Sequence, residues 1–230
     1  SGADGRVSPA PPPDWDDWLA SLTAAQNATL RVSAVSASGL EGTEPAVALN
    51  SERDDDEVAG SAKGARDVDL PPWSKGRYGS AIGRAVHGVL QTVDLSDGSG
   101  IEAAVSAQCI AEGVVEFSDV VAALVRSALD SDLVKRAAVR EHWRESYVAT
   151  VRADGTVVEG IADLIYREDD GSLVVVDYKT DAVPAAALSA RAAFYAPQIE
   201  AYTSALRDAS QSAVRAQLLF LHPTAPAQPV

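Results

Sequence analysis

The chain has 230 residues, of which 47% are hydrophobic and 23% charged, and it carries a formal net charge of −14. That length and apolar content suffice for one domain with its own core plus an extension. No apolar stretch is long enough to span a membrane and no signal peptide is recognisable. A single cysteine, Cys109, excludes both an intrachain disulfide framework and a four-cysteine iron–sulfur cluster, and it fits a reducing compartment.

The N-terminal part reads as an extension rather than a domain. Residues 1–13 are rich in Gly, Pro and Ala, which favours disorder. Residues 14–25 place Trp15, Trp18, Leu19 and Leu22 at helical spacing. Residues 30–36 suit a strand, and residues 39–70 carry an acidic run at 54–57 among small residues, which is typical of a solvated linker. We expect a flexible N-terminal extension over residues 1–72 and a folded domain over residues 73–230.

From residue 73 onward the apolar periodicity predicts helices first and strands next. Helices are expected over residues 75–93, 100–112, 119–129 and 131–138, with Ser118 capping the third. Residues 141–152, 156–166 and 173–178 predict a three-stranded antiparallel meander, with turns at Asp154-Gly155 and Asp169-Asp170-Gly171. A helix over 184–207, restarted at Pro197, and a strand over 217–222 complete an α+β order.

The second hairpin of this meander, within residues 160–180, carries the chemistry. If it is symmetric about Asp170, Asp163 lies opposite Asp177, and Lys179 shares the face of Asp177. Two carboxylates at cross-strand distance repel each other unless a cation lies between them. Two acids beside one lysine therefore predict a divalent-metal site that acts on a phosphodiester.

Five sequence elements, in this order, resemble the nuclease motifs of the PD-(D/E)XK superfamily, in the RecB-like branch found at the C-terminus of AddA-type helicase-nucleases. They are GRAVHGVL at 83–90, WRESY at 143–147, Gly160-x-x-Asp163, Asp177-Tyr178-Lys179-Thr180 and Tyr195-x-x-Gln198-x-x-x-Tyr202. The resemblance implies an α+β, restriction-endonuclease-like core. In such a core, a central mixed sheet with an antiparallel meander is flanked by helices, and a helical part precedes it.

The resemblance also assigns roles to individual residues. The residues expected to bind Mg²⁺ or Mn²⁺ are His87, Asp163, Asp177 and, through its backbone carbonyl, Tyr178. Lys179 is expected to stabilise charge on the attacked phosphate or to orient the attacking water. Gln198 and Tyr202 lie one helical turn apart, and they are expected to support the site and contact the DNA backbone.

Other residues keep two interpretations. Glu145, on the strand before Asp163, either reaches the metal directly or through water, or is an exposed strand residue. Tyr195 either belongs to the core or stacks on a base. His142 and His222 are expected to be structural. Five arginines are candidates for phosphate contacts, although scattered arginines are ordinarily just solvated: Arg77, Arg84, Arg136, Arg140 and Arg144.

As a whole, the resemblance implies a metal-dependent DNA exonuclease domain of a helicase-nuclease that processes double-strand breaks in recombinational repair. The sequence has no P-loop, so the helicase motor is expected elsewhere in the same polypeptide or complex. A further expected partner is the second subunit of the helicase-nuclease. The absence of methionine leads us to expect a piece of a longer protein. The expected location is cytoplasmic, at the nucleoid and not at a membrane.

Two alternatives remain open. An inactive nuclease fold could serve as a scaffold for DNA or subunit binding, but the complete set of Asp163, Asp177 and Lys179 argues against it. A stand-alone exonuclease of the CRISPR-associated or phage type is disfavoured by the lack of further cysteines and of methionine. The net charge of −14 further predicts weak intrinsic affinity for DNA, with delivery by a motor or partner.

Overall fold

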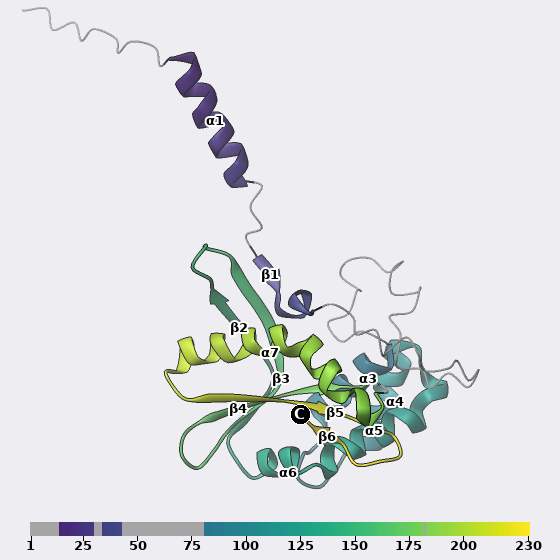
Figure 1. The fold of residues 1–230 in the computed structure, drawn as a ribbon. Coiled ribbons are helices and arrows are strands. Elements are labelled where there is room, and N and C mark those ends of the chain that lie inside the picture. The colour runs from purple at the N-terminus through teal and green to yellow at the C-terminus, as the bar shows by residue number, and fades with distance from the viewer. Residues whose placement is uncertain (1–13, 30–33, 43–80, 182) are drawn as a thin grey trace, which may run out of the picture. The chain divides into compact units, whose positions relative to one another are not determined.

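The computed structural model describes residues 14–29, 34–42, 81–181 and 183–230 (Figure 1). Its contacts divide the chain into two compact units, Ser1–Ser33 and Ala34–Val230. Within the first unit, α1 (Trp15–Thr29) confirms the predicted helix and extends it to Thr29. The rings of Trp15 and Trp18 stack with centroids 5.0 Å apart, and both stay exposed.

A mixed sheet organises the second unit (Figure 1). Its strands are β1 (Ala34–Ser36), β2 (His142–Val151), β3 (Val157–Arg167), β4 (Leu173–Lys179), β5 (Val214–Phe220) and β6 (Gln228–Pro229). Strands β2, β3 and β4 form the predicted antiparallel meander, while β5 lies parallel to β4 and β1 parallel to β3. The expected α+β fold with a central mixed sheet is confirmed.

The long strand β3 has three neighbours on two edges. Strand β2 pairs along nearly all of it, from His142↔Tyr166 to Val151↔Val157. Because β2 fills one edge, β1 and β4 must share the other, where they pair with residues 157–159 and 164–167. Between them, residues 160–163 of β3 have no partner on that edge among the described strands. The candidate site lies at this gap.

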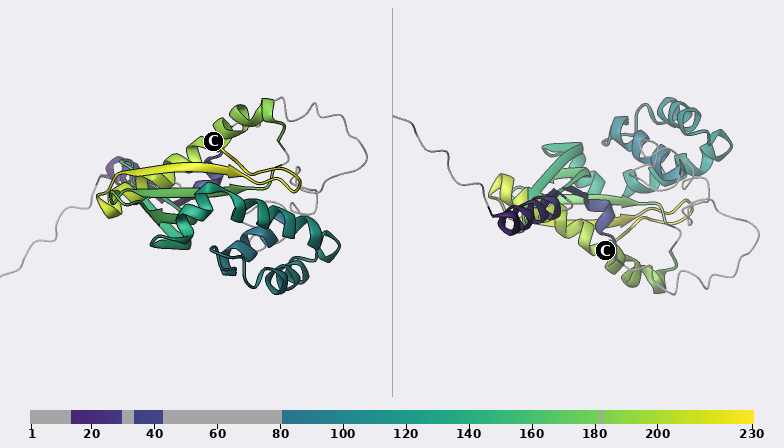
Figure 2. Two further views of the ribbon diagram at one scale, coloured as in Figure 1. Left: turned by 90° about the horizontal axis from the view of Figure 1, so that it is seen from below. Right: turned by 90° about the horizontal axis from the view of Figure 1, so that it is seen from above.

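Helices cover both faces of the sheet (Figure 2). On one face lie α3 (Ala81–Thr92), α4 (Ile101–Glu112), α5 (Ser118–Asp130) and α6 (Asp132–Ala138). The long helix α7 (Leu188–Ser210) covers the other, and short 3₁₀ turns precede it (η4, Ala185–Ala187), precede α5 (η3, Val115–Phe117) and follow β1 (η1, Ala37–Leu40). The two faces therefore have separate apolar cores, one against α3 and α5 and one against α7.

The meander changes face along its length. Val158 and Ala162 of β3 pack with α7, whereas Leu164 and Tyr166 pack with the α3–α6 helices. In a regular strand all even-numbered residues point to the same face. Because residues 158 and 162 point to one face and residues 164 and 166 to the other, the alternation must be broken between 162 and 164. That break falls beside Asp163.

Several local predictions are corrected. Ser118 does not cap α5 from outside but is its first residue, and its hydroxyl donates to the carbonyl of Val115 at 2.6 Å. Pro197 does not restart a helix, because α7 runs through it. Proline has no backbone N–H, so the helical hydrogen-bond ladder is interrupted at this position. In the preceding turn, the carbonyl of Phe194 accepts a hydrogen bond from the backbone N–H of Gly42 at 2.8 Å. The last long strand begins at Val214, earlier than predicted.

The N-terminal boundary also differs from the expectation. Strand β1 and the buried Ala37 of η1 belong to the second unit, so residues 34–42 are part of the sheet domain rather than of a linker. Other predictions for the N-terminal part lie outside the described residues. They are the rest of the linker, residues 30–33 of the predicted strand, residues 75–80 of the predicted helix, Arg77 and the boundary at residue 73. None of the helices that the structure describes has the length and apolar character needed to cross a membrane.

Candidate active site

The two predicted acids lie where strands β3 and β4 part. The pairing register follows the predicted symmetry about Asp170 through Arg167↔Leu173, Tyr166↔Val174, Ile165↔Val175 and Leu164↔Val176. It ends there, one position before Asp163 and Asp177. From that point β4 continues beside β5 as far as Lys179↔Phe220, while β3 continues beside β2. The sheet therefore opens at the two carboxylates.

Asp163 is held in the opening by two contacts. Its Oδ2 accepts a hydrogen bond from the backbone N–H of Tyr178 at 2.7 Å, and its Oδ1 lies 3.2 Å from Nδ1 of His87. The amide of Tyr178 is available because β4 no longer pairs with β3 at this level. His87 is brought in by α3, whose apolar stripe of Val86, Val89 and Leu90 packs on the sheet.

Glu145 completes a cluster with these two residues. It has a positive φ of 49°, and it is skipped in the β2–β3 register between Arg144↔Leu164 and Ser146↔Ala162. A non-glycine residue in this conformation is uncommon and costs of the order of 1 kcal/mol or more. Ligand atoms of His87, Glu145 and Asp163 all lie within 4.8 Å of one another. Of the two interpretations of Glu145, its position favours participation in the site.

Asp177 stands beside this cluster but faces a different partner. Its Oδ2 lies 2.8 Å from Nζ of Lys179; the Asp177 side chain is buried, and that of Lys179 is 13% exposed. Lys179 is thus on the same side as Asp177, as predicted, and this is the side of α7. The ligand atoms that gather around His87 do not include those of Asp177, so its assignment as a metal ligand stays a prediction.

The Lys179 ammonium has three electron-rich neighbours. Besides Asp177, it donates to Oε1 of Gln198 at 2.9 Å and lies 4.0 Å from the ring centroid of Tyr195. An ammonium has three N–H donors, and each finds an acceptor or a π face here. Lys179 is therefore fixed in position by two elements, β4 and α7.

The buried charges perturb one another. Burial is the largest influence on Asp177 and raises its pKa to about 6, with Asp163 adding to the increase and Lys179 opposing it. Burial also disfavours the charged form of Lys179, but the attraction of Asp177 and of other carboxylates prevails, so the pKa of Lys179 is raised above its ordinary value. The lysine is accordingly protonated at neutral pH.

Gln198 and Tyr202 link Lys179 to Gly160 of β3. Nε2 of Gln198 donates to the hydroxyl of Tyr202 at 3.0 Å, and both side chains are buried. The Tyr202 ring lies over Gly160, where a Cβ would approach a ring carbon to 2.6 Å and the Cβ of Ala37 to 3.0 Å. The glycine of the Gly160-x-x-Asp163 motif is thus needed for close packing. A direct contact of these residues with DNA stays a prediction.

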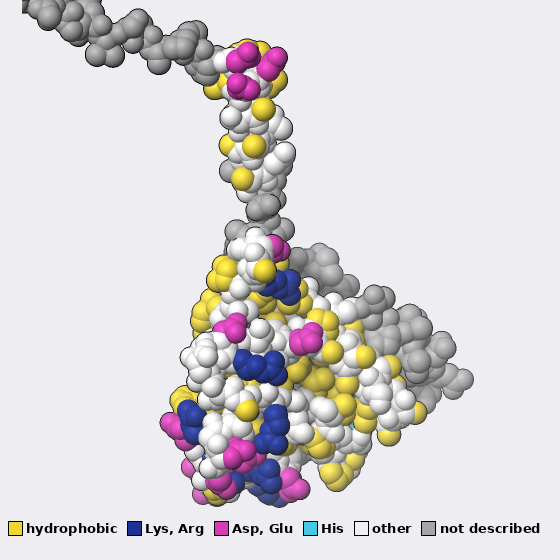
Figure 3. Space-filling view, turned by 60° about the vertical axis from the view of Figure 1, so that its left-hand side comes forward, with side chains coloured by type: hydrophobic (Ala, Val, Ile, Leu, Met, Phe, Trp, Pro, Cys, Tyr) yellow, Lys and Arg dark blue, Asp and Glu magenta, His cyan; other side chains and the backbone are white. Residues whose placement is uncertain are grey.

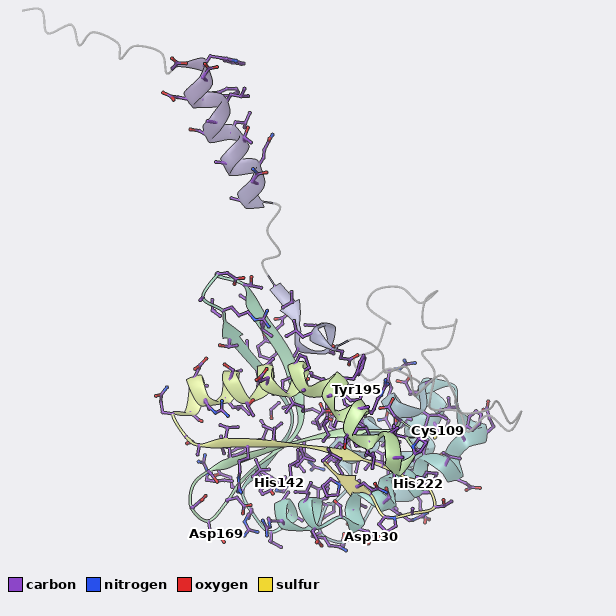
Figure 4. All side chains as sticks on the ribbon, in the orientation of Figure 1. Cys109, Asp130, His142, Asp169, Tyr195 and His222 are labelled. Carbon is purple, nitrogen blue, oxygen red and sulfur yellow. The ribbon has the colours of Figure 1, made fainter. Side chains whose placement is uncertain are left out.

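Two further residues take part that the sequence did not suggest. Asp181 accepts hydrogen bonds from the hydroxyl of Tyr195 at 2.8 Å and from Arg191 at 2.8 Å. Arg191 in turn donates to the Tyr195 hydroxyl at 3.0 Å, so the ring facing Lys179 is held in place by a partly buried network. The available signals were the position of Asp181 two residues after Lys179 and that of Arg191 one helical turn before Tyr195. Tyr195 lies on α7 in Figure 4.

Other candidate residues contact only neighbouring protein groups among the described residues. The side chain of Tyr178 packs on the α3 face, opposite Asp177 and Lys179, and its carbonyl as a metal ligand stays a prediction. His142 and His222, labelled in Figure 4, bond locally to the carbonyl of Arg140 and the amide of Thr224.

The described candidate arginines are engaged with protein groups. Arg144 donates to the carbonyls of Leu90 and Val93 at the end of α3. Arg84 pairs with Glu112, Arg136 with Glu168, and Arg140 with Glu168 and Asp169. On the face drawn in Figure 3, basic and acidic side chains are interspersed. This distribution gives no support to a phosphate-tracking role for these four arginines.

A mixed sheet that opens at an acid pair, with a lysine two residues beyond the second acid, defines a nuclease of the PD-(D/E)XK type. The family model of the PD-(D/E)XK nuclease superfamily matches residues 64–229, and the chain belongs to this superfamily. The chain is also similar to an ATP-dependent helicase/nuclease subunit of Desulforudis audaxviator (strain MP104C), with 30% identity over 175 residues. The match covers 67% of this chain but 14% of that protein. The resemblance to RecB-like nucleases is thereby confirmed.

Proposed function

We propose that this domain is a metal-dependent deoxyribonuclease that removes nucleotides from DNA ends. The observation that carries the proposal is the cluster of His87, Glu145 and Asp163, adjoining the ion pair of the buried Asp177 with the largely buried Lys179. Burying several ionisable groups together costs free energy, and a core that serves only as a scaffold gains nothing from it. A site that binds a cation and a phosphate recovers that cost.

The donor set suits a divalent cation. Two carboxylates and an imidazole, with ligand atoms within 4.8 Å of one another, match the span that one ion bridges at bond lengths of about 2.0–2.4 Å. We propose Mg²⁺ or Mn²⁺, with Asp177 and the Tyr178 carbonyl as additional ligands; the imidazole favours Mn²⁺. When bound, such a cation lowers the pKa of a water molecule and neutralises charge on the phosphate.

The remaining residues hold the Asp163 carboxylate and the Lys179 ammonium in position and neutralise charge on the phosphate. The backbone amide of Tyr178 fixes the Asp163 carboxylate, which keeps Oδ1 directed at His87. Lys179, protonated because its pKa is raised, can present its positive charge to a phosphate but cannot accept a proton from water. Its role is therefore to stabilise the charge that develops on the phosphate. Gln198, Tyr202 and the ring of Tyr195 hold the ammonium in place for that purpose.

In the cell, we propose that the domain works as the nuclease of a helicase-nuclease in double-strand break processing. The similarity to a helicase/nuclease subunit supports this, and so does the net charge of −14, which disfavours independent binding to DNA. The motor would lie in the same polypeptide or complex, and a second helicase-nuclease subunit is a further proposed partner.

The test is to incubate the purified chain with end-labelled linear single- and double-stranded DNA in Mg²⁺, in Mn²⁺ and in EDTA. Degradation with either cation and none in EDTA is the expected result, and His87→Ala should reduce it most at limiting Mn²⁺. Cleavage that persists in chelator would exclude the metal mechanism. Intact DNA under every condition, from a folded chain that binds Mn²⁺ in calorimetry, would favour the scaffold alternative.

A further inference from the structure

One face of the β2–β3 hairpin leads from the metal-ligand cluster to the protruding tip of the hairpin, which extends past α7 in Figure 1. Val148 and Val158 pack toward α7, and Thr150 donates to Asp208 of that helix at 2.8 Å. The residues of β2 that alternate with Val148 and Thr150 therefore face the other way. They are Tyr147, Ala149 and Val151, and their partners in the register are Ile161, Glu159 and Val157.

The same face holds the cluster itself. Asp163 meets His87 of α3, and Glu145 shares that cluster, so Glu145 and Tyr147 are alternate residues on one side of β2, as Asp163 and Ile161 are on β3. The break in alternation lies beyond them, at Arg144 and Leu164, and does not disturb this relation. Tyr147 thus follows Glu145 by one step of the strand alternation, about 7 Å along the strand.

This face is open and carries an aromatic ring held in place. Tyr147 is 64% exposed and Val151 is 67% exposed, while Ile161 and Val157 are half-buried. The hydroxyl of Tyr147 donates to Oε2 of Glu159 across the strand pair at 2.6 Å, which restrains the ring without covering it. The six residues of the face include a carboxylate and no lysine or arginine. Its chemistry favours the flat, apolar surface of a base over a phosphate.

We propose that this face is a platform on which bases of the DNA strand entering the site stack, with Tyr147 as the stacking residue next to the scissile phosphate. The inference rests on the proposed nuclease function, because a nuclease must hold the strand it cuts and this surface is continuous with its ligand cluster. The occupant is single-stranded DNA, since duplex bases already stack on their neighbours. Stacking on an aromatic side chain is tolerant of sequence, as an exonuclease requires.

The test measures binding of a single-stranded oligonucleotide containing 2-aminopurine, whose fluorescence reports stacking, in Mn²⁺. All variants carry Lys179→Ala so that cleavage does not consume the probe. Because Tyr147→Ala removes one stacking interaction, it should raise Kd by about 5- to 150-fold and relieve the fluorescence quenching. Tyr147→Phe keeps the ring and should stay within about twofold of the parent. Trp143→Ala is the matched control, because Trp143 is an exposed aromatic of the same strand that lies beside Arg167, on the other side of the break in alternation.

The outcomes separate the two proposals. Unchanged binding by Tyr147→Ala would overturn the proposed platform. Equal losses of affinity in Tyr147→Phe and Tyr147→Ala would also overturn it, because the hydrogen bond from the hydroxyl to Glu159, and not stacking, would then determine binding. A change in self-association without a change in DNA binding would assign the face to a protein contact instead. Cleavage assays of the chain with Lys179 intact run alongside: no cleavage refutes the nuclease function, whereas cleavage with the same KM in Tyr147→Ala refutes the platform alone. Thermal melting confirms that each variant is folded.

Discussion

The buried carboxylate of Asp177 allows the electrostatics of the site to be tested without DNA. Its pKa is raised from 3.8 to about 6 in the folded chain, chiefly by burial. The unfolded chain therefore loses this proton at lower pH than the folded chain does, and ionisation of Asp177 destabilises the metal-free fold progressively between about pH 4 and pH 6. At about 1.4 kcal/mol per pKa unit, the destabilisation approaches ~3 kcal/mol at pH 7.

Asp177→Asn removes this titration while preserving the shape of the side chain. In EDTA, the free energy of unfolding of the unmodified chain minus that of Asp177→Asn should fall by about 2 kcal/mol between pH 4.5 and pH 7. Urea denaturation across that range measures it, and other carboxylates cancel because both chains contain them. A difference that rises with pH would refute the reasoning, since it would mean that the attraction of Lys179 outweighs burial. Saturating Mn²⁺ should stabilise the unmodified chain more than the variant.

Two further predictions concern the packing around the site. Gly160→Ala forces a Cβ against the Tyr202 ring, and we expect it to lower the free energy of unfolding by about 1–3 kcal/mol and to reduce cleavage, with Tyr202→Leu in the same chain recovering stability but not activity. Deletion of residues 1–33 should leave the melting temperature of the sheet domain unchanged, whereas deletion of residues 1–42 removes β1 and the buried Ala37 and should lower both stability and activity. Equal melting temperatures for the two truncated chains would contradict the assignment of residues 34–42 to the domain.

Much of the hairpin could be predicted because its information is local. The turn at Asp169-Asp170-Gly171 determines the register, and the alternation of apolar residues on β4 then sets the faces of Asp177, Tyr178 and Lys179. The helices on the α3 side follow from their amphipathic periodicity in the same way. His87 was found by resemblance, since a single histidine on an apolar helix carries no local signal of its purpose.

The rest depends on contacts between distant segments. Strand β1 lies within the strand predicted over residues 30–36, but its parallel pairing with β3, more than a hundred residues downstream, has no local signal. Asp181 and Arg191 gain their role from the fold, which places a loop after β4 against the first turns of α7. The turn at Asp154-Gly155 was predicted from its residues, but no propensity scale predicts a glutamate with positive φ at position 145.

The conformation of Glu145 and the opening of the sheet have a common origin in the charge of the site. Regular pairing through Asp163 would bury its carboxylate against β4, opposite Asp177, without a cation. Parting the strands instead exposes the amide of Tyr178 to Asp163 and turns its other oxygen toward His87. The neighbouring strand β2 changes face between Arg144 and Glu145, and the positive φ of Glu145 costs of the order of 1 kcal/mol or more. That change brings the Glu145 carboxylate to His87 and Asp163, and Tyr147 with the rest of the hairpin face lies on the side opposite α7. The irregularity that assembles the proposed cation site thus lies at the start of the open strand face.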